Sequence, residues 1–398
     1  MEYSCYFHCP LLRFAVTFVI TTLLVGYVGA HSSSSSGTYN LCNFPAIFNF
    51  GDSNSDTGGA SALFRQFGQP EGQTYFGAPA GRYSDGRLVI DFIAEKLGFP
   101  YLSAYLDSIG ANFSHGANFA TAGSTIKKLN HSVPQGGLSP ISLNIQKNEY
   151  AQFTTRTQTL RNPGGVFQNL MPKNECFSQA LYTIDIGQND ITSSYKIGMS
   201  KEEIRNITSD ILDQFSENVK DIYDLGGRYF WIHNTGPVGC LAYMLDSLQI
   251  TAAQIDKIGC VKPINDIAQY FNRRLNETVV KLRKELPSSA ITYVDVYKVK
   301  YSLISNAKKY GFTQPLRACC GRGGKFNFNS KYQCGAEMKV INGTEILIGS
   351  CKNPKVKISW DGVHYTEAAN KFVFDQIVDG SFSDPPMSLT MACHRSTL

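Results

Sequence analysis

The stretch that decides the fold is residues 46–58, which read AIFNFGDSNSDTG. Four of its first five residues are apolar, and a nearly continuous apolar run without alternation is typical of a strand covered on both faces. The polar turn Gly51-Asp52-Ser53 follows at once, so Ser53 lies at the carboxyl end of the predicted strand. Ligands of open parallel sheets bind beyond the carboxyl ends of the strands, which makes this turn a candidate site.

Further strands and helices alternate along the chain. Apolar, β-rich runs predict four more strands, at residues 117–120, 181–186, 229–233 and 291–296. Apolar residues recur every three or four positions over 204–225 and form one stripe from Ile264 to Leu286, which predicts two amphipathic helices. Strands that alternate with helices predict an α/β fold with an open, mostly parallel sheet. No linker divides the 398 residues, so we expect one such domain.

Candidate catalytic residues follow the first three predicted strands. Ser53 follows the first strand, Gly123 the second and Asn189 the third, so all three are expected at the same edge of the sheet. A serine hydroxyl is a weak nucleophile and needs an imidazole to take its proton and a carboxylate to orient that imidazole. The run Asp361-Gly362-Val363-His364 contains both groups, and a helix is predicted directly after it at 366–377.

Two other interpretations of the serine turn are excluded by its sequence. The nucleophile elbow of α/β hydrolases reads G-x-S-x-G, but the position two after the serine is Ser55. The pattern Asp52-x-Asn54-x-Asp56 resembles the start of an EF-hand calcium loop. However, Gly58 comes one place too late for the sharp turn, and the twelfth position is Leu63 where a glutamate is required.

Structural alternatives stay open for several of these residues. Asp, Asn and Ser in the serine turn also form Asx-type turns that cap the following segment. Asn189-Asp190 could cap a helix, because both side chains accept hydrogen bonds from free N–H groups. Gly123 could be present only for its backbone angle. The sequence alone does not separate these roles from catalytic ones.

The motifs resemble those of the GDSL family of SGNH hydrolases. The resemblance is to the secreted plant GDSL esterase/lipases, of the early-nodulin-like and fucosidase-labelled subgroup, and it runs from Phe44 to Ile377. In the second motif this chain has Ala122 before Gly123, where many relatives have two glycines. Four motifs carry the resemblance in the family's order: Gly51-Asp52-Ser53, Asn118-Phe119-Ala120-Thr121-Ala122-Gly123, Gly187-Gln188-Asn189-Asp190 and Asp361-Gly362-Val363-His364.

The resemblance implies a three-layer, flavodoxin-like SGNH hydrolase fold with a central, mostly parallel sheet. It implies a catalytic triad of Ser53, Asp361 and His364, and hydrolysis of carboxylic esters through an acyl-enzyme on Ser53. The implied oxyanion hole consists of the Ser53 N–H, the Gly123 N–H and the Asn189 side-chain amide. The implied substrates are small-molecule or polysaccharide esters, such as acetylated wall polysaccharides, and no cofactor is needed.

Three other functions are alternatives to ester hydrolysis. An acyltransferase would use the same triad, with an alcohol in place of water. A non-catalytic carbohydrate-binding wall protein would not need the catalytic side chains that all four motifs retain. A glycosidase needs paired carboxylates around the glycosidic bond, and nothing in the sequence gives Asp52 and Asp56 that geometry.

The amino terminus is predicted to be a signal peptide. An apolar stretch from Leu11 to Val28 ends in Gly29-Ala30 and is followed by a serine-rich polar run. A signal anchor is the alternative, and no later segment has the ~18 apolar residues of a membrane span. We therefore expect a secreted, extracellular or cell-wall protein. Its expected parts are a signal peptide at 1–30, a low-complexity joint at 31–41, the hydrolase domain at 42–380 and a carboxyl-terminal tail at 381–398.

Cysteines and glycosylation sites agree with secretion. Of eleven cysteines, Cys5 and Cys9 lie in the predicted signal peptide, and the remaining odd number leaves at least one free or paired between chains. We expect a disulfide between Cys240 and Cys260, and disulfides within 319–351 that brace the loop of the Asp-x-x-His pair. N-glycosylation sequons occur at Asn112, Asn130, Asn206, Asn276 and Asn342.

Charge and cysteine spacing argue against other classes of protein. The chain has no C-x-x-C pair, and Cys319 and Cys320 are adjacent, so no metal site is expected. The net charge of +5 is mild and its basic residues are scattered, so nucleic acid is not an expected partner. The sequence leaves the oligomeric state open.

Overall fold

The computed structural model describes residues 40–128, 138–161, 165, 167–335, 339–341, 343–346 and 348–395. The predicted signal peptide lies outside these residues, as do the sequon asparagines Asn130 and Asn342. Among the described helices, none combines the length and the apolar character that a bilayer crossing requires.

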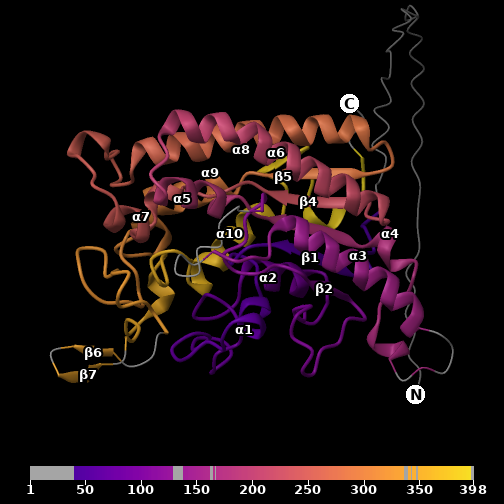
Figure 1. Cartoon of the computed structure of the whole chain (residues 1–398), viewed down its shortest axis with the longest axis horizontal. Helices are drawn as coiled ribbons and strands as arrows, with labels where there is room; N and C mark the ends of the chain where they lie inside the picture. The colour runs from indigo at the N-terminus through magenta and orange to yellow at the C-terminus, as the bar shows by residue number, and fades with distance from the viewer. Residues whose placement is uncertain are drawn as a thin grey trace, which may run out of the picture. The chain divides into compact units, whose positions relative to one another are not determined.

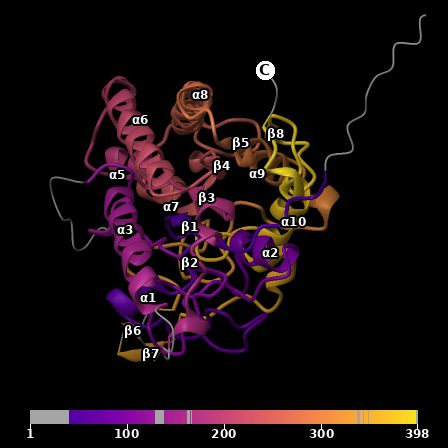
Figure 2. The ribbon, with the colours of Figure 1, turned by 90° about the vertical axis from the view of Figure 1, so that its right-hand side faces the viewer.

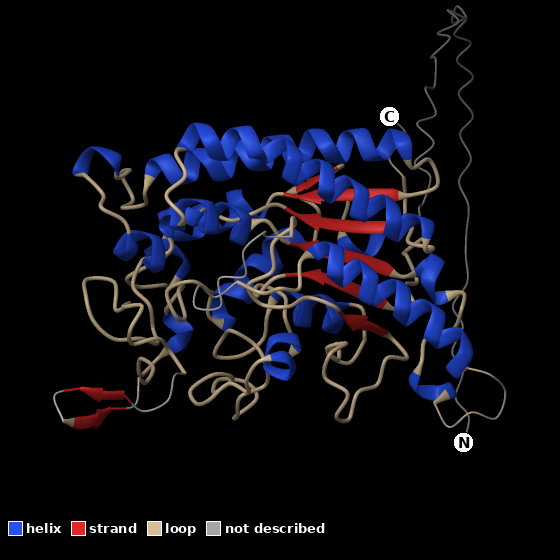
Figure 3. Cartoon of the chain, viewed as in Figure 1, coloured by secondary structure: helices blue, strands red, loops and turns tan. Residues whose placement is uncertain are grey.

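A six-stranded sheet forms the centre of the fold (Figures 1 and 3). Its order is β2-β1-β3-β4-β5-β8, and the first five strands are parallel. The order 2-1-3-4-5 is the one found in flavodoxin-like folds. The predicted fold class is confirmed, and each of the five predicted strands is present. The strands are β1 Ile47–Gly51, β2 Gly116–Asn118, β3 Leu181–Asp185, β4 Tyr229–His233, β5 Ala290–Val294 and the antiparallel β8 Ser383–Asp384.

Helices cover both faces of this sheet, which gives three layers (Figure 2). Alternate strand residues such as Phe48 and Tyr182 pack in one core with the helices α3 Leu143–Leu160, α6 Lys201–Asp224 and α8 Lys262–Glu285. Their strand neighbours Ile47 and Leu181 point the other way. That second core contains residues of α2 Val89–Lys96, α9 Val296–Ser305 and α10 Glu367–Ile377. Strands buried on both faces account for the apolar runs in the sequence.

Local signals explain where the two longest helices begin and where α8 ends. The α6 helix starts with a capping box, in which the Ser200 hydroxyl accepts from the Glu203 N–H at 3.3 Å and the Glu203 carboxylate accepts from the Ser200 N–H at 2.7 Å. The α8 helix has Pro263 in its first turn and ends at Glu285, two residues before Pro287.

Four disulfides account for eight of the nine cysteines outside the predicted signal peptide. The predicted Cys240–Cys260 bond is confirmed, and Cys176 is a buried free thiol. The other three bonds are Cys42–Cys393, Cys319–Cys351 and Cys320–Cys334. The Cys42–Cys393 bond and the pairing of β8 with β5 tie residues beyond 380 to the hydrolase domain.

Replacing both Cys240 and Cys260 by alanine should lower the free energy of unfolding by about 3 kcal/mol. The bond closes a loop with a sequence separation of 20 residues, and its loss raises the conformational entropy of the unfolded chain. Denaturant titration with linear extrapolation measures the change. Cys176→Ala is the control, because it removes a buried sulfur that cross-links nothing. An unfolding free energy equal to that of the wild type would show that the bond does not stabilise the domain.

Candidate active site

The serine turn follows β1 and packs directly on the end of β3. Gly51 has φ of +157°, and a Cβ atom there would lie 2.4 Å from the Asp185 carbonyl oxygen, so only glycine allows this approach. The Asp52 N–H donates to the same carbonyl at 3.1 Å. The carboxyl ends of these adjacent strands therefore hold the turn that carries Ser53.

The two serines of the turn differ in their surroundings. The Ser55 hydroxyl accepts from the Asn49 amide at 3.0 Å, and the Ser55 carbonyl accepts from the Asn118 amide at 2.7 Å. Neither the hydroxyl nor the backbone N–H of Ser53 forms a hydrogen bond with any described residue. Interior hydrogen bonds thus hold the hydroxyl and carbonyl of Ser55, whereas the hydroxyl and N–H of Ser53 remain free to interact with a substrate.

Asp56 joins the serine turn to the loop that carries Gly123. Its Oδ1 accepts from the N–H groups of Gly58 and Gly59, at 2.8 and 2.6 Å, at the start of α1 Gly59–Leu63. Its Oδ2 accepts from the Ala122 N–H at 2.8 Å. The capping interpretation is therefore confirmed for Asp56. Gly123 comes next with φ of +81°, and its own N–H has no hydrogen bond within the described part of the chain.

Asn189 connects three segments of the site. It lies in the first turn of α5 Gln188–Lys196, but its side chain does not cap that helix. Its Nδ2 donates to the Ser124 carbonyl at 2.9 Å and to Asp52 Oδ2 at 3.3 Å. The amide therefore lies between the loop after β2 and the turn after β1, and the longer bond to Asp52 is the weaker of the two.

The Asp361-x-x-His364 loop forms a closed unit. Asp361 Oδ2 lies 2.5 Å from His364 Nδ1, while Oδ1 accepts from the N–H groups of Val363 and His364 at 2.8 and 2.7 Å. Burial alone would raise the pKa of Asp361, but the His364 charge and these hydrogen bonds hold it below its ordinary value. His364 Nε2 is buried and has no hydrogen bond to a described residue. The ring of Tyr83 lies 4.9 Å from the imidazole, centroid to centroid.

Trp360 anchors this loop in the protein interior. Its fully buried indole N–H donates to Glu71 Oε2 at 2.7 Å. The N–H groups of Cys319 and Cys320 donate to the carbonyls of Ser359 and Trp360, at 3.0 and 2.6 Å. The disulfides of these two cysteines pack on the indole, so they brace the Asp361-x-x-His364 loop as expected from the sequence.

Sequence reasoning did not identify Glu71 as part of the site. Burial, together with the charge of Asp361, raises the pKa of Glu71 well above its ordinary value. No motif surrounds this residue, and its partner Trp360 is almost three hundred positions away, so no local signal could have found it.

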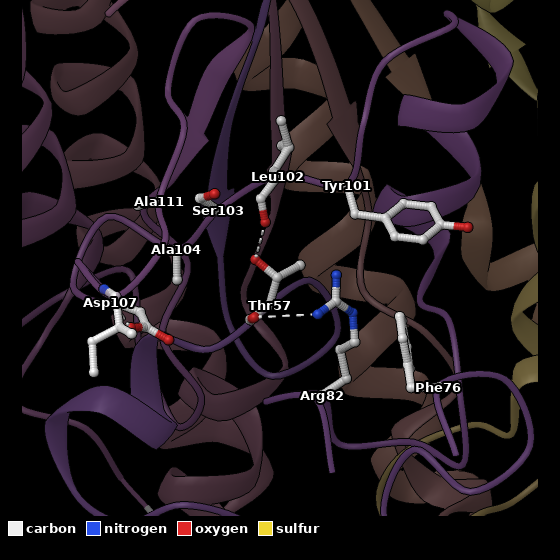
Figure 4. Close-up of a pocket in the computed structure, with 10 residues that line it drawn as sticks. Thr57, Phe76, Arg82, Tyr101, Leu102, Ser103, Ala104, Asp107 and Ala111 are labelled. Carbon is white, nitrogen blue, oxygen red and sulfur yellow. Dashed lines mark hydrogen bonds between the residues drawn. The ribbon is translucent and has the colours of Figure 1, made fainter. Parts of the chain in front are cut away.

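A hollow lies next to Thr57, four residues after Ser53, and none of the candidate catalytic residues is among the residues that line it (Figure 4). Its volume is about 220 Å³, and Thr57, Phe76, Arg82, Tyr101 and Asp107 are among its lining residues. The Arg82 guanidinium is bonded to the Asp91 carboxylate at 3.0 and 2.6 Å and to two backbone carbonyls. The Asp91 carboxylate therefore already neutralises the Arg82 charge. Among the described residues, no other Lys or Arg side chain lines the hollow.

Comparison with known proteins gives the family. The family model described as GDSL-like Lipase/Acylhydrolase matches residues 47–377. The chain belongs to this family. An Arabidopsis thaliana GDSL esterase/lipase is 57% identical over 89% of this chain and 93% of its own length. GDSL esterase/lipase ACHE of Zea mays is 56% identical over 91% of this chain and 92% of its own length. Alpha-L-fucosidase 3 of Arabidopsis thaliana is 53% identical over 92% of this chain and 96% of its own length.

The family membership confirms the resemblance drawn from the four motifs. This GDSL family member is a carboxylic ester hydrolase of the serine esterase/lipase kind. The family model begins in β1 and ends at the last residue of α10, so it spans every segment of the candidate site.

Proposed function

We propose that Ser53 is the nucleophile of this esterase, with His364 as general base and Asp361 as its orienting partner. The observation that carries the proposal is the short Asp361–His364 contact together with the unpaired Nε2 atom. The carboxylate fixes the proton on Nδ1, which leaves Nε2 to accept the serine proton. The effect of the His364 charge, which lowers the pKa of Asp52, the residue before Ser53, supports a place for the imidazole near the serine turn.

Ester hydrolysis then follows from these groups. Ser53 Oγ attacks the ester carbonyl as His364 takes its proton, and the tetrahedral oxyanion accepts hydrogen bonds from the free N–H groups of Ser53 and Gly123. Asn189 becomes the third donor when its amide turns from Asp52 to the oxyanion. His364 then protonates the leaving alcohol, and water releases the acyl group from Ser53.

Glycoside hydrolysis is not supported by the carboxylates near Ser53. Asp52 accepts hydrogen bonds from Asn54 and Asn189, and Asp56 accepts four backbone N–H groups. A glycosidase needs one carboxyl group as acid and a second as base or nucleophile on either side of the bond. Although one relative is named a fucosidase, the geometry favours acyl transfer for this chain.

We also propose that the protein is secreted and acts on small-molecule or polysaccharide esters outside the cell. Four disulfides favour an oxidising compartment, and the sequon residues Asn112 and Asn206 are exposed. Asn276 is half-buried on α8. Protein purified from the culture medium should hydrolyse p-nitrophenyl esters or acetylated glycans and should lose mass on deglycosylation. Retention of the full chain inside cells would contradict secretion.

Replacing Asn189 by alanine should lower kcat by about 10²–10³, with little change in KM. The reason is that the amide binds the oxyanion only in the transition state. Steady-state kinetics on a chromogenic ester measures the effect, and a thermal melt checks that losing the Ser124 contact does not unfold the loop. Asp213→Ala, on the exposed face of α6, is the control. An unchanged kcat would leave Asn189 with a structural role only.

A further inference from the structure

A tyrosine that takes no part in the proposed triad is held between the two segments that carry it. Tyr83 lies in the loop before α2. The residue before it, Arg82, donates at 3.3 Å to the carbonyl of Thr57, four residues after the proposed nucleophile. The residue after it, Ser84, donates through its hydroxyl at 3.1 Å to the carbonyl of Tyr365, the residue after the proposed base. Direct contacts on both sides therefore fix the backbone of Tyr83 next to both segments.

The side chain of Tyr83 contacts the proposed base itself. Arg82 and Ser84 are 6% and 0% exposed, whereas Tyr83 between them is half-buried. Its ring centroid lies 4.9 Å from that of the His364 imidazole, with an angle of 36° between the two planes. The ring of Phe67, which is also half-buried, packs on Tyr83 with the centroids 4.3 Å apart. Phe67 and Tyr83 thus form an aromatic wall beside the imidazole.

This aromatic wall differs from the aromatic residues of the core. Phe48 and Phe50 are fully buried, as expected for rings that only fill space. Burying a ring completely gains more free energy than burying part of it, so packing alone favours full burial. Both rings of the aromatic wall instead keep part of their surface open, next to the group that must meet the substrate. The open surface is therefore available to a ligand.

The reaction decides which part of an ester meets the aromatic wall. In acyl transfer by a serine, the histidine that takes the serine proton then gives it to the leaving group. The oxygen of the leaving alcohol must therefore come within reach of His364 Nε2, while the acyl carbon is bound to Ser53. Because Tyr83 contacts the imidazole, the aromatic wall borders the alcohol part of the ester.

We propose that Phe67 and Tyr83 form the subsite for the alcohol part of the ester, and that this subsite selects aromatic alcohols over small aliphatic ones. Aromatic rings attract one another through offset and edge-to-face contacts, in addition to the area that they bury. A sugar would bring several hydroxyl groups that need hydrogen-bond partners, and the two side chains offer only the Tyr83 hydroxyl. The inference rests on the triad proposed above and names the class of alcohol that it releases.

The test compares kcat/KM for benzyl acetate and n-butyl acetate, which share an acyl group and release alcohols of similar acidity. The ratio of the two values therefore measures contacts with the alcohol part. In the wild type this ratio should favour benzyl acetate about tenfold. Tyr83→Leu should reduce the preference to about twofold or less, whereas Tyr83→Phe should keep it because the ring remains.

Phe99→Leu is the matched control, because it removes a half-buried ring that also packs on a histidine. The Phe99 ring lies 5.0 Å from that of His115, centroid to centroid. His115 comes directly before β2, so this pair lies at the opposite edge of the sheet from the serine turn. Phe99→Leu should therefore keep the turnover and the benzyl preference of the wild type.

Phe67→Leu makes the test independent of whether Tyr83→Leu folds well. This variant removes one ring of the aromatic wall and leaves Tyr83 to contact the imidazole. It should lower the benzyl preference about threefold, with the turnover of n-butyl acetate nearly unchanged. A benzyl preference equal to that of the wild type in Phe67→Leu and in Tyr83→Leu would overturn the proposal.

A second pair of substrates, benzyl acetate and benzyl butyrate, changes only the acyl group. The ratio of their kcat/KM values should be the same in the wild type, Phe67→Leu and Tyr83→Leu. A change in this ratio alone would place the aromatic wall on the acyl side and overturn the proposal. So would an equal loss of turnover with both acetates, because Tyr83 would then only support His364. A larger loss with an acetylated methyl glucoside than with benzyl acetate would overturn the choice of an aromatic alcohol.

These outcomes differ from those that would overturn the proposed function. Hydrolysis of both acetates by the wild type, with a benzyl preference that neither leucine variant changes, would overturn the inference alone. Full turnover in Ser53→Ala, or no turnover in the wild type, would overturn the proposed function and the inference together.

Discussion

Replacing Ser53 by alanine should abolish ester hydrolysis and leave the fold intact. The hydroxyl is the only group proposed to form a bond with the acyl carbon, and its loss should lower kcat on the scale of about 10⁶ known for serine hydrolases. The change removes one oxygen atom that forms no hydrogen bond with a described residue, so the melting temperature should hardly change.

A serine-directed phosphonate locates the nucleophile directly. Mass spectrometry of the labelled peptide should place the adduct on Ser53 in the wild type and find no adduct in Ser53→Ala. Ser55→Ala is the matched control in the same turn: it should still be labelled, although it loses the contact with Asn49 and is expected to be less stable. An adduct on Ser55 would overturn the assignment.

Replacing Asp361 by asparagine should lower kcat by as much as about 10⁴. The asparagine oxygen can still accept from the N–H groups of Val363 and His364, so the loop should keep its shape. Its amide nitrogen would face His364 Nδ1, however, and donate to it. This contact moves the imidazole proton to Nε2, and a protonated Nε2 can no longer accept the proton of Ser53.

Kinetics against pH test this assignment. Activity of the wild type should fall as the pH is lowered, because only a neutral imidazole accepts the Ser53 proton. His364→Ala should remove most activity together with the histidine part of that dependence. Asp375→Asn, on the exposed face of α10, should match the wild type. Full activity in Asp361→Asn would show that a Ser-His pair suffices and that Asp361 only shapes the loop.

The sheet could be predicted from the sequence because its strands are buried on both faces. Each appeared as an apolar run, and the polar residues after β1, β2 and β3 fall at the same edge because the strands are parallel. The amphipathic helices α6 and α8 could be predicted because each buries one stripe of apolar residues that recur every three or four positions. In contrast, the apolar residues of α3 do not gather into a clear stripe, and no helix was predicted there.

The support around the site could not be predicted, because it depends on contacts between distant positions. Glu71 meets Trp360 with no motif at either end. Three of the four disulfides join cysteines whose pairing has many possible solutions until the fold is known. The pair Cys240–Cys260 was the exception because both cysteines lie near the ends of predicted regular elements, whereas the adjacent Cys319 and Cys320 could each pair with Cys334 or Cys351.

The division of the active site between the two ends of the chain has a consequence for the timing of activity. Ser53 follows β1, the first described strand along the chain, whereas His364, its proposed base, stands just before α10, and Cys42 must wait for Cys393. A ribosome-bound chain would therefore expose a serine with no imidazole to activate it. On the proposed triad, hydrolysis can begin only after the carboxyl-terminal segment has emerged and docked, so a chain that is still growing cannot yet attack esters.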